Sequence, residues 1–536
     1  MKTCRFLLVL GVMVQSLYAT PKMAAPPAAA GQAAKDGPSG VAQNTAGGQS
    51  LAAAVAGVVA GAALPRRDSC ASTVTALRAI DAGATPDGSC VFVAGYHVPG
   101  DGGGGWFVYA RTSAASDNGG TVIAPAAGTG RWRRLYRDAV TVKQFGAVGD
   151  GVADDTPALQ AAIDSKAALV VVDQGKFRIT RPLDLRSGAR TFAGLSRDGS
   201  AIIQSTDDAA VLQVGGAGLK VASLTLRFAN PQPLANTKAN AVEIYALFQS
   251  TFDNLLIYRA NRGFYLPQQA ASNGANWLFS CTISNVTVGY YSNRAFELRA
   301  YHGGISGNVL QNIYCLGRDD RDVALDTNEA IYLASWSDGL LQQINVESTN
   351  PTEAIYVGSC DNLVMQAVHF EGLRPRTNFG GLIHIDGGNV TLSDCSVAYS
   401  TIGLPDSYAA IRLGTPNTHV SINGVTERDN TVTARAWKLF ALPNDETGCM
   451  AEAVNCSTKG FTSTGESRSV PSRILRYNDT YASINLNGFL ILSGEGNPEG
   501  VVTTKQPALY LRRDGGAAAG LYFKPGSAGN TGWILK

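Results

Sequence analysis

Glu329-Ala330-Ile331-Tyr332-Leu333 returns 24 residues later as Glu353-Ala354-Ile355-Tyr356-Val357, and a second pattern repeats at the same offset. The second pattern is Ile344-Asn345-Val346-Glu347, followed by Val368-His369-Phe370-Glu371. Apolar and polar residues alternate in these segments, as they do in a strand that buries one face. Two strand patterns that return together at one interval indicate a solenoid.

Both patterns extend into columns of apolar residues. One column reads Leu224, Leu255, Val286, Ile313, Ile344, Val368 and Val397, and the other reads Phe264, Phe296, Ile331, Ile355, Ile383 and Ile411. The intervals vary from 24 to 35 residues. Because the coils of a β-helix keep their strands and vary their turns, this spacing favours a parallel β-helix over leucine-rich or helical repeats, whose periods are tighter.

The composition and the first residues indicate which partners and which compartment to expect. Among 536 residues there are 60 glycines and only 16% charged residues, and the formal net charge is +2. Without a basic field or a long Lys/Arg run, nucleic acid is not an expected partner. Residues 1–19 have the order of a secretory signal peptide, so we expect a secreted, extracellular protein.

Residues 20–68 are an Ala/Gly/Pro-rich linker by composition. Their most apolar stretch, residues 51–64, is too short for a membrane-spanning helix, which needs about 20 residues, so we expect no membrane association after signal cleavage.

The cysteines fit an oxidising compartment. Eight remain after signal cleavage, and we expect Cys70 to pair with Cys90 and Cys449 with Cys456, because each pair is close in sequence. The other four are spaced like core residues. No CxxC motif is present, so we expect no metal site of the zinc type.

A helix is expected before the first coils. Asp155-Thr156-Pro157 precedes Ala158-Leu159-Gln160-Ala161-Ala162-Ile163, with Pro near a first helical turn. This position suits a cap over the open end of a solenoid.

The segment from Val142 to Pro157, VKQFGAVGDGVADDTP, resembles the opening of the pectate-lyase-like β-helix domain of phage tailspikes and secreted polysaccharide-active enzymes. Residues 95–107 and 130–135 look like the small head domain of tailspikes, and residues 500–516 and 529–533 look like a tail-fibre tip. The resemblance covers roughly residues 90–536. It implies an all-β protein with a right-handed parallel β-helix.

The expected domains follow from these segments. They are a signal peptide (1–19), a linker (20–68), a β-rich head (69–138), the β-helix (139–465) and a β-rich C-terminal tip (466–536).

The resemblance also implies a function, which is the degradation of an extended surface or extracellular polysaccharide by a homotrimer. The alternative is a carbohydrate-binding adhesin or structural protein without turnover. Gly317-Arg318-Asp319-Asp320 is similar to a polygalacturonase motif, but the Asn-Thr-Asp and Gly-His-Gly motifs are missing, so pectin hydrolysis is disfavoured. Hydrolysis and β-elimination both stay open. No cofactor is expected, apart from Ca²⁺ if the enzyme is a lyase.

Side chains between the apolar positions should point outward, where a substrate can reach them. They form the column Tyr265, Glu297, Tyr332, Tyr356, His384 and Arg412, which we predict as substrate-binding residues. Aromatic and polar groups stacked about 4.8 Å apart suit an extended glycan. An aromatic ladder that only stabilises the sheet is the competing interpretation.

Carboxylates supply the catalytic candidates. Glu347 and Glu371 end the same strand on neighbouring coils, within about 5 Å of each other, which is close to the spacing in retaining glycosidases. Asp320 and Asp322 belong to a charged loop, residues 318–326, that could carry acids over a groove or bind a cation. A strand-end glutamate and a charged loop can also be purely structural. We assign Asp154 and Asp155 a structural role in the entry turn of the helix.

Overall fold

The structure is a computed structural model that describes most of the chain from residue 70 onward. The described residues are 70–267, 276–300, 304–317, 329–347, 353–373, 380–398, 401–402, 408–415, 418–428, 431–432, 438–441, 450–454, 474–476, 483–486, 489–504, 507–514, 520–526 and 528–536. The predicted signal peptide, the linker, Asp320 and Asp322 lie outside them. None of the helices in these ranges has the length and hydrophobicity that a membrane span requires.

The head is a small sheet with one short helix. Its elements are β1 (Cys70–Ala71), α2 (Val74–Arg78), β2 (Cys90–Val93), β3 (Gly105–Ala110), β4 (Val122–Ile123) and β5 (Arg131–Arg134), in the sheet order β1-β2-β3-β5-β4. Phe107, Tyr109 and Trp132 are fully buried in its core, where they pack with Val74 and Leu77 of α2.

The expected disulfide in the head is wrong, because Cys70 and Cys90 are free and exposed. In the β1–β2 pair Cys70 lies opposite Phe92, two residues beyond Cys90. Such a diagonal separation of about 7–8 Å exceeds the usual Cα distance of a disulfide. Cys449 and Cys456 lie outside the described residues, whereas the four central cysteines are buried core residues, as predicted: Cys281, Cys315, Cys360 and Cys395.

The entry to the solenoid is built by the elements β6 (Ala139–Thr141), η1 (Val142–Phe145), β7 (Asp150–Asp154) and α3 (Thr156–Asp164). The predicted helix and the structural role of the two aspartates are confirmed. Asp154 accepts hydrogen bonds from the backbone and the hydroxyl of Thr156. Asp155 occupies the N-cap position, but its carboxylate accepts from the N–H groups of Val148 and Gly149 and makes no helix-cap hydrogen bond. It therefore closes the entry turn instead of capping the helix.

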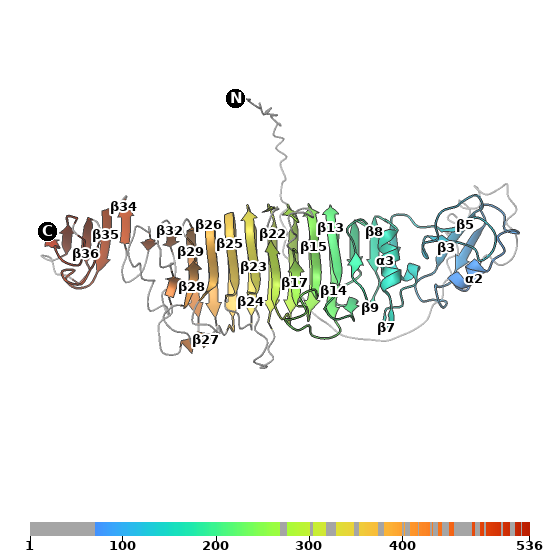
Figure 1. Ribbon diagram of the computed structural model, residues 1–536, viewed down its shortest axis with the longest axis horizontal. Helices are drawn as coiled ribbons and strands as arrows, with labels where there is room; N and C mark the ends of the chain where they lie inside the picture. Colours follow the sequence, from blue (N-terminus) through green and yellow to red (C-terminus); the bar gives the residue numbers. More distant parts are fainter. Residues whose placement is uncertain are drawn as a thin grey trace, which may run out of the picture. The chain divides into compact units, whose positions relative to one another are not determined.

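The solenoid consists of parallel strands stacked coil on coil (Figure 1). They are β8 (Leu169–Val172), β9 (Gly175–Ile179), β10 (Leu183–Asp184), β11 (Thr191–Gly194), β12 (Ser200–Gln204), β13 (Leu212–Ala217), β14 (Lys220–Phe228), β15 (Asn240–Phe248), β16 (Thr251–Tyr258), β17 (Arg262–Tyr265), β18 (Leu278–Phe279), β19 (Thr282–Gly289), β20 (Arg294–Arg299), β21 (Ile305–Ser306), β22 (Val309–Leu316), β23 (Ile331–Ser337), β24 (Leu340–Glu347), β25 (Ile355–Glu371), β26 (Gly380–Ala398), β27 (Thr401–Ile402), β28 (Tyr408–Leu413), β29 (Thr418–Arg428), β30 (Thr431–Val432), β31 (Lys438–Ala441), β32 (Met450–Val454) and β33 (Ile474–Arg476). The predicted all-β solenoid is confirmed.

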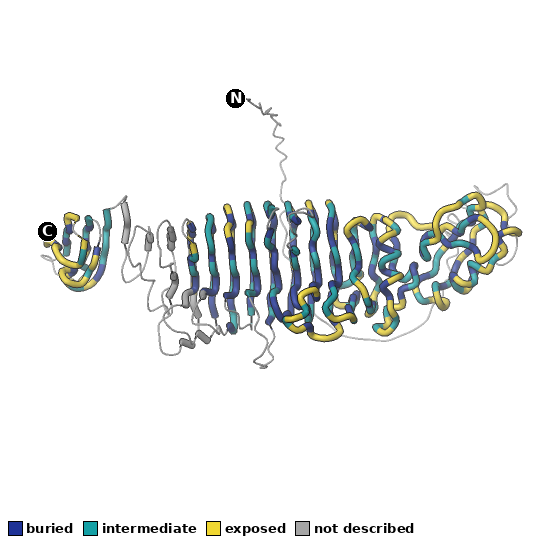
Figure 2. The backbone as a smooth tube through the Cα atoms, in the orientation of Figure 1, coloured by how far each residue is buried: buried dark blue, intermediate teal, exposed yellow. Residues whose placement is uncertain are grey.

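The second apolar column lies in register through six coils. The register runs Phe264, Phe296, Ile331, Ile355, Ile383, Ile411, and all six side chains are buried. The alternation of buried and less buried residues along the strands is visible in Figure 2. These residues belong to one continuous core.

The first column contains one wrong step. Leu224 to Val368 follow the predicted order, but Val397 lies opposite Phe370, not opposite Val368. Because inward side chains recur every two residues, a shift of two keeps every residue on its face, and the hydrophobic pattern cannot detect it.

Each coil turns at corner residues with a left-handed backbone. One corner column has φ between 53° and 56° and consists of Ser223, Asn254, Asn285, Asn312, Gln343, Ala367 and Asp394. Side-chain amides join neighbouring corners, since Asn254 donates to Ser223 and Asn312 donates to Asn285. Within the coil of β23 and β24, Ser335, Asp338 and Gln343 all have positive φ.

The corners divide the outside of the solenoid into separate faces. We call the outward side of the series β13, β15, β17, β20, β23, β25, β26 and β28 the tyrosine face. We call the outward side of the series β9, β12, β14, β16, β19, β22, β24, the end of β25 and the end of β26 the glutamate face.

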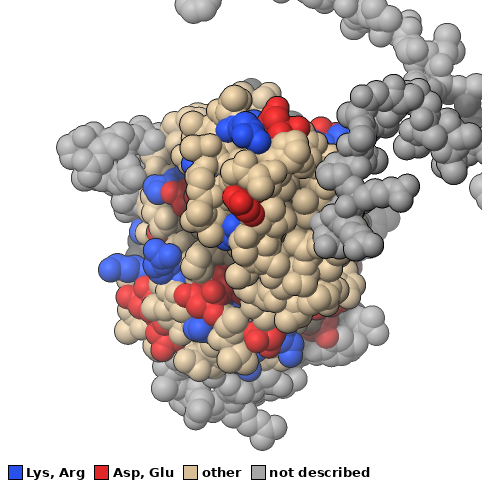
Figure 3. Space-filling model, turned by 90° about the vertical axis from the view of Figure 1, so that its right-hand side faces the viewer, with Lys and Arg blue, Asp and Glu red and all other residues tan. Residues whose placement is uncertain are grey.

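The C-terminal residues form a separate sheet. Its strands are β34 (Ser483–Leu486), β35 (Phe489–Gly494), β36 (Ala508–Arg512), β37 (Leu521–Lys524) and β38 (Ile534–Leu535). Tyr510, Tyr522 and Trp533 form its small core. Figure 3 shows a different surface, the one on the right of Figure 1, where basic and acidic side chains are interspersed instead of forming a large patch of one sign.

Candidate functional site

The predicted outward column on the tyrosine face is in register. Tyr265, Glu297, Tyr332, Tyr356, His384 and Arg412 lie opposite one another on successive coils. The rings of Tyr332 and Tyr356 stack with centroids 4.6 Å apart, and the edge of His384 meets Tyr356 at 5.2 Å. The sequence therefore places these six residues correctly along the solenoid.

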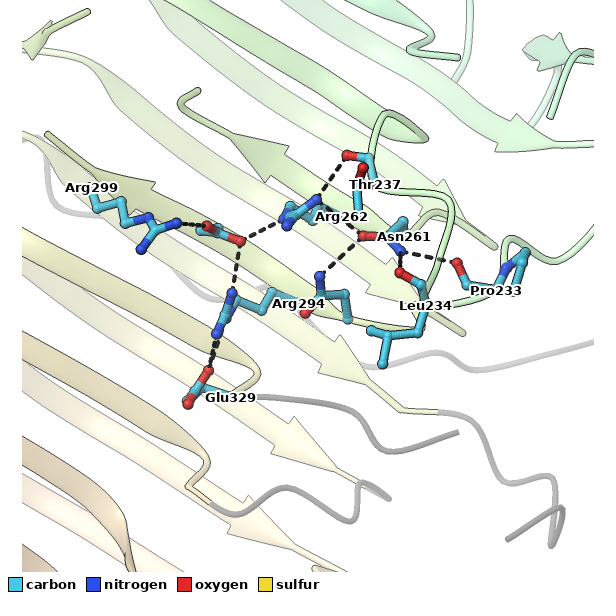
Figure 4. A network of polar contacts seen from close by, with 10 residues as sticks. Pro233, Leu234, Thr237, Asn261, Arg262, Arg294, Arg299 and Glu329 are labelled. Carbon is cyan, nitrogen blue, oxygen red and sulfur yellow. Dashed lines mark hydrogen bonds and ion pairs between the residues drawn. The ribbon is translucent and has the colours of Figure 1, made fainter. Parts of the chain in front are cut away.

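Glu297 is nevertheless buried, with only 1% of its side chain exposed. Arg262 Nε lies 2.5 Å and Arg294 Nη1 2.8 Å from its Oε2, and Arg299 Nη2 lies 3.1 Å from its Oε1. Figure 4 shows these arginines converging on one carboxylate, while Arg262 also donates to the carbonyl of Thr237 in the loop before β15. The expectation that Glu297 is open to a substrate is wrong, because arginines cover it.

The charge balance of this network holds Glu297 ionised. Burial alone would raise the pKa of Glu297, but Arg262 and Arg294 outweigh burial and lower the pKa below its usual value. Arg294 also bridges to Glu329, with Nη2 2.6 Å from Oε2. The same arginine stacks over Tyr332 at 4.7 Å, as Arg262 does over Tyr265 at 4.5 Å. Arg262 and Arg294 thus each pair with Glu297 and also stack on a tyrosine ring.

A second network surrounds His384. Its Nδ1 lies 2.6 Å from Glu353 Oε1 and its Nε2 3.0 Å from Asp386 Oδ1. Tyr356 donates a hydrogen bond of 2.7 Å to Asp386 Oδ2. Burial would lower the pKa of His384, but Asp386 and Glu353 outweigh burial and raise it to about 9. His384 is therefore an imidazolium between two carboxylates at neutral pH.

Sequence reasoning missed the acidic partners on the tyrosine face. Glu329 and Glu353 are the first residues of the two repeated segments, so their equivalence was visible in the sequence. Asp386 stands two residues after His384 and therefore points to the same side of the strand. These paired contacts favour the stabilising ladder over a platform for sugar rings.

The glutamate face brings together different groups. Glu347 and Glu371 lie opposite each other on neighbouring coils, as predicted. Tyr314 Oη donates to Glu347 Oε2 at 2.5 Å, and Asn345 Nδ2 donates to Oε1 at 2.6 Å. His369 Nε2 lies 3.1 Å from Glu371 Oε2. Burial and the hydrogen bond to Glu347 raise the pKa of Tyr314 above its usual value, so the phenol stays protonated.

Exposure distinguishes the two faces. Side chains of Glu371 and His369 are 41% and 32% exposed, whereas those of His384 and Glu353 are 12% and 10% exposed. A reacting carboxylate must reach its substrate, so the glutamate face is the better candidate active site.

The predicted substrate-binding tyrosines and the predicted catalytic glutamates lie on different faces. Tyr332 precedes the corners at Ser335, Asp338 and Gln343, and Glu347 follows them. Tyr314, His369 and Asn345 are instead the nearest partners of the glutamate pair, and sequence reasoning missed them. In the described part of the chain, no group of three or more His, Cys, Asp or Glu residues could hold a metal ion.

Two segments match known families. Residues 70–137 match the phage tail protein small four-stranded beta-sheet domain, and residues 139–223 match the rhamnogalacturonase A/epimerase, pectate lyase-like family. The predicted resemblance to pectate-lyase-like and tailspike proteins is thereby confirmed.

Solved structures show the same fold at low identity. The tailspike of Acinetobacter phage vb_AbaP_AS12 has a TM-score of 0.59 at 14% identity, covering 86% of this chain and 87% of that chain. The enzymatically active domain of tailspike protein 2 from bacteriophage CBA120 has a TM-score of 0.50 at 16% identity, covering 75% of this chain and 56% of that chain.

A curated relative matches over a short stretch. The Mu-like prophage FluMu defective tail fiber protein of Haemophilus influenzae is 37% identical over 82 residues, which are 15% of this chain. The match spans 13% of that relative's length.

Proposed function

We propose that this protein is a secreted enzyme that cleaves glycosidic bonds in an extended polysaccharide, with Glu347 and Glu371 as the reacting carboxylates. The observation that carries the proposal is the register pairing, on neighbouring coils, of the half-buried Glu347 with Glu371, whose side chain is 41% exposed. Strands of adjacent coils lie about 4.8 Å apart, close to the carboxyl separation of about 5–5.5 Å in retaining glycosidases.

The hydrogen bonds suggest a division of roles. Tyr314 and Asn345 each donate to one oxygen of Glu347 and fix its orientation, as a nucleophile attacking the anomeric carbon requires. Glu371, beside His369, would protonate the leaving oxygen and then deprotonate the water that releases the glycosyl intermediate. In β-elimination His369 would be the base, because the raised pKa of Tyr314 disfavours its phenolate.

The class of substrate rests on the fold and its relatives. A tailspike domain described as enzymatically active and a pectate-lyase-like family share this fold. We further propose export by the predicted signal peptide and assembly as a homotrimer, as the tailspike-like ends imply. A carbohydrate-binding protein without turnover is the alternative.

The test is turnover of a panel of bacterial and plant polysaccharides. Turnover is measured as the release of reducing ends and as the ultraviolet absorbance of unsaturated products. On a substrate that the protein cuts, Glu347→Gln and Glu371→Gln should each lower turnover by about 10²-fold or more while binding is retained. Asp361→Asn is the matched control, because Asp361 is an exposed carboxylate on β25 outside the pair.

Three results bear on the proposal. Near-normal turnover in both glutamine variants would refute the site, and Asp320→Asn would then test the charged loop. Binding of a polysaccharide with no turnover by the unmodified protein would favour the adhesin. New reducing ends matched one for one by absorbing unsaturated ends would assign β-elimination, and new reducing ends without that absorbance would assign hydrolysis.

A further inference from the structure

A cleft of about 560 Å³ opens on the glutamate face, on the coils before the carboxylate pair. Residues that line it include Lys176, Asp198, Thr225, Arg227, Leu256 and Tyr258. Arg227 lies opposite Tyr258, and Thr225 lies opposite Leu256 on the next coil. The cleft is therefore built from the same outward columns that carry Glu347 and Asn345 further along the solenoid.

The cleft presents cationic groups that lack partners. Arg227 Nε is buried and has no hydrogen-bond partner among the described residues. Lys176 is exposed and forms no ion pair with any residue that the structure describes. The acid of the cleft, Asp198, already lies 3.3 Å from Arg197. The lining thus holds two cations, Lys176 and Arg227, and one acid, and this balance suits an anionic ligand.

The outward column is continuous from the cleft to the carboxylate pair. Its register runs from Arg227 through Tyr258, Gly289 and Leu316 to Glu347. At Gly289 a Cβ would lie 2.5 Å from the ring of Tyr258, so the absence of a side chain leaves room for that ring. Four coil steps of about 4.8 Å separate Arg227 from Glu347, or roughly 19 Å.

Aromatic rings accompany this column. Tyr258 packs beside Tyr290 with centroids 5.8 Å apart, and Tyr290 is 42% exposed. Tyr258 is also close enough to Tyr314 to contribute to the raised pKa of that phenol. Rings spaced along a groove provide apolar surfaces for the faces of sugars.

We infer that the cleft is a subsite for an acidic sugar of the polysaccharide, whose carboxylate pairs with Arg227 and Lys176 while Tyr258 and Leu256 contact the ring. This inference rests on the proposed function and names its substrate class, an acidic polysaccharide bound along the glutamate face. The planar guanidinium of arginine suits a carboxylate, which it can bind through two parallel hydrogen bonds. A sugar held in the cleft lies roughly 19 Å from the carboxylate pair.

Titration calorimetry on the full protein tests the subsite. The probes are alginate, polygalacturonate and hyaluronate, their carboxyl-reduced neutral forms, and the neutral polymers dextran and mannan. On an acidic polymer that the protein binds, carboxyl reduction and Arg227→Gln should each weaken binding about tenfold or more, and the two effects should not add. Arg197→Gln, which removes the same charge nearby from a guanidinium already paired with Asp198, should change binding less than about twofold.

The outcomes separate this inference from the proposed function. Binding confined to neutral polymers, no binding to any acidic probe, or equal effects of Arg227→Gln and Arg197→Gln would overturn the subsite. Turnover that depends on Glu347 but not on Arg227 would support the cleavage function and contradict the acidic-sugar subsite. Binding that depends on Arg227 in a protein without turnover would leave the subsite standing and refute the enzyme. Circular dichroism of each variant shows whether the coils remain folded.

Discussion

The imidazolium of His384 should make the stability of the coils depend on pH. Its pKa is raised from 6.5 to about 9 by Asp386 and Glu353, against the opposing effect of burial. Because the folded state binds this proton more tightly than the unfolded state, the contribution is complete below pH 6.5 and is lost as pH rises through about 9. Stability should therefore fall across this window.

The magnitude follows from the size of the shift. A rise from 6.5 to about 9 corresponds to roughly 3 kcal/mol at about 1.4 kcal/mol per pKa unit. Water reaches part of this site and screens the ion pairs, so we expect about 2 kcal/mol. Asp386 adds no slope to this window, because His384 and Tyr356 lower the pKa of its carboxyl below the ordinary value of about 4, against the opposing effect of burial.

Urea unfolding at about pH 6 and about pH 9.5 measures this difference in the unmodified protein, in His384→Gln and in His369→Gln. His384→Gln should be less stable at about pH 6 and should lose most of the slope, because glutamine cannot carry the charge. His369→Gln controls for removal of a histidine from the other face. If His384→Gln keeps the full decline, or the unmodified protein shows none, the charged network does not act as described.

Further predictions concern the same coils and the assembly. Glu297→Ala should lower the free energy of unfolding in urea by about 3–5 kcal/mol, because buried arginines lose their counter-charge. Glu297→Gln should lower it by a similar amount if the lost charge, and not the lost volume, is the cause. Gly414→Ala should lower the measured pKa of His384, since the new Cβ would fall 1.6 Å from Asp386 Oδ1 and displace it. Tyr356→Ala should lower stability without weakening polysaccharide binding, and weakened binding at unchanged stability would restore the tyrosine face as a sugar platform. Light scattering should give a trimer. Deletion of residues 497–536 should weaken this trimer more than it destabilises the coils, and a monomeric full chain would contradict the proposed assembly.

Alternation in the sequence was sufficient to predict which residues face inward and which coils are neighbours. Ile331 and Ile355 stack as their repeated segments predict, and so do the outward residues Tyr332 and Tyr356. The placement of Glu347 beside Glu371 follows from the same offset. These are local properties, because side chains alternate along a strand and equal offsets keep equal positions in register.

The register of one core residue and the burial of one candidate site residue could not be predicted from alternation. Val397 was predicted two residues out of register, because a shift of two residues keeps the same side chains buried. Glu297 was correctly placed in its column but is covered by Arg262 and Arg299, one from the preceding coil and one two residues further along its own strand. Alternation predicts the direction of a side chain and not what lies over it.

The solenoid, the order of its coils and the two outward columns could be predicted from the residues alone, since each depends on a two-residue period and a repeat offset. The separation of the tyrosine face from the glutamate face could not be predicted in this way. That separation depends on left-handed corners at residues as different as Ser335, Asp338 and Gln343, which share a backbone conformation but no residue type. Non-glycine residues adopt this conformation at an energetic cost and do so where packing and hydrogen bonds across coils compensate for it. The physical reason is that a corner is stabilised by the coils above and below it, and these contacts exist only once the chain has folded.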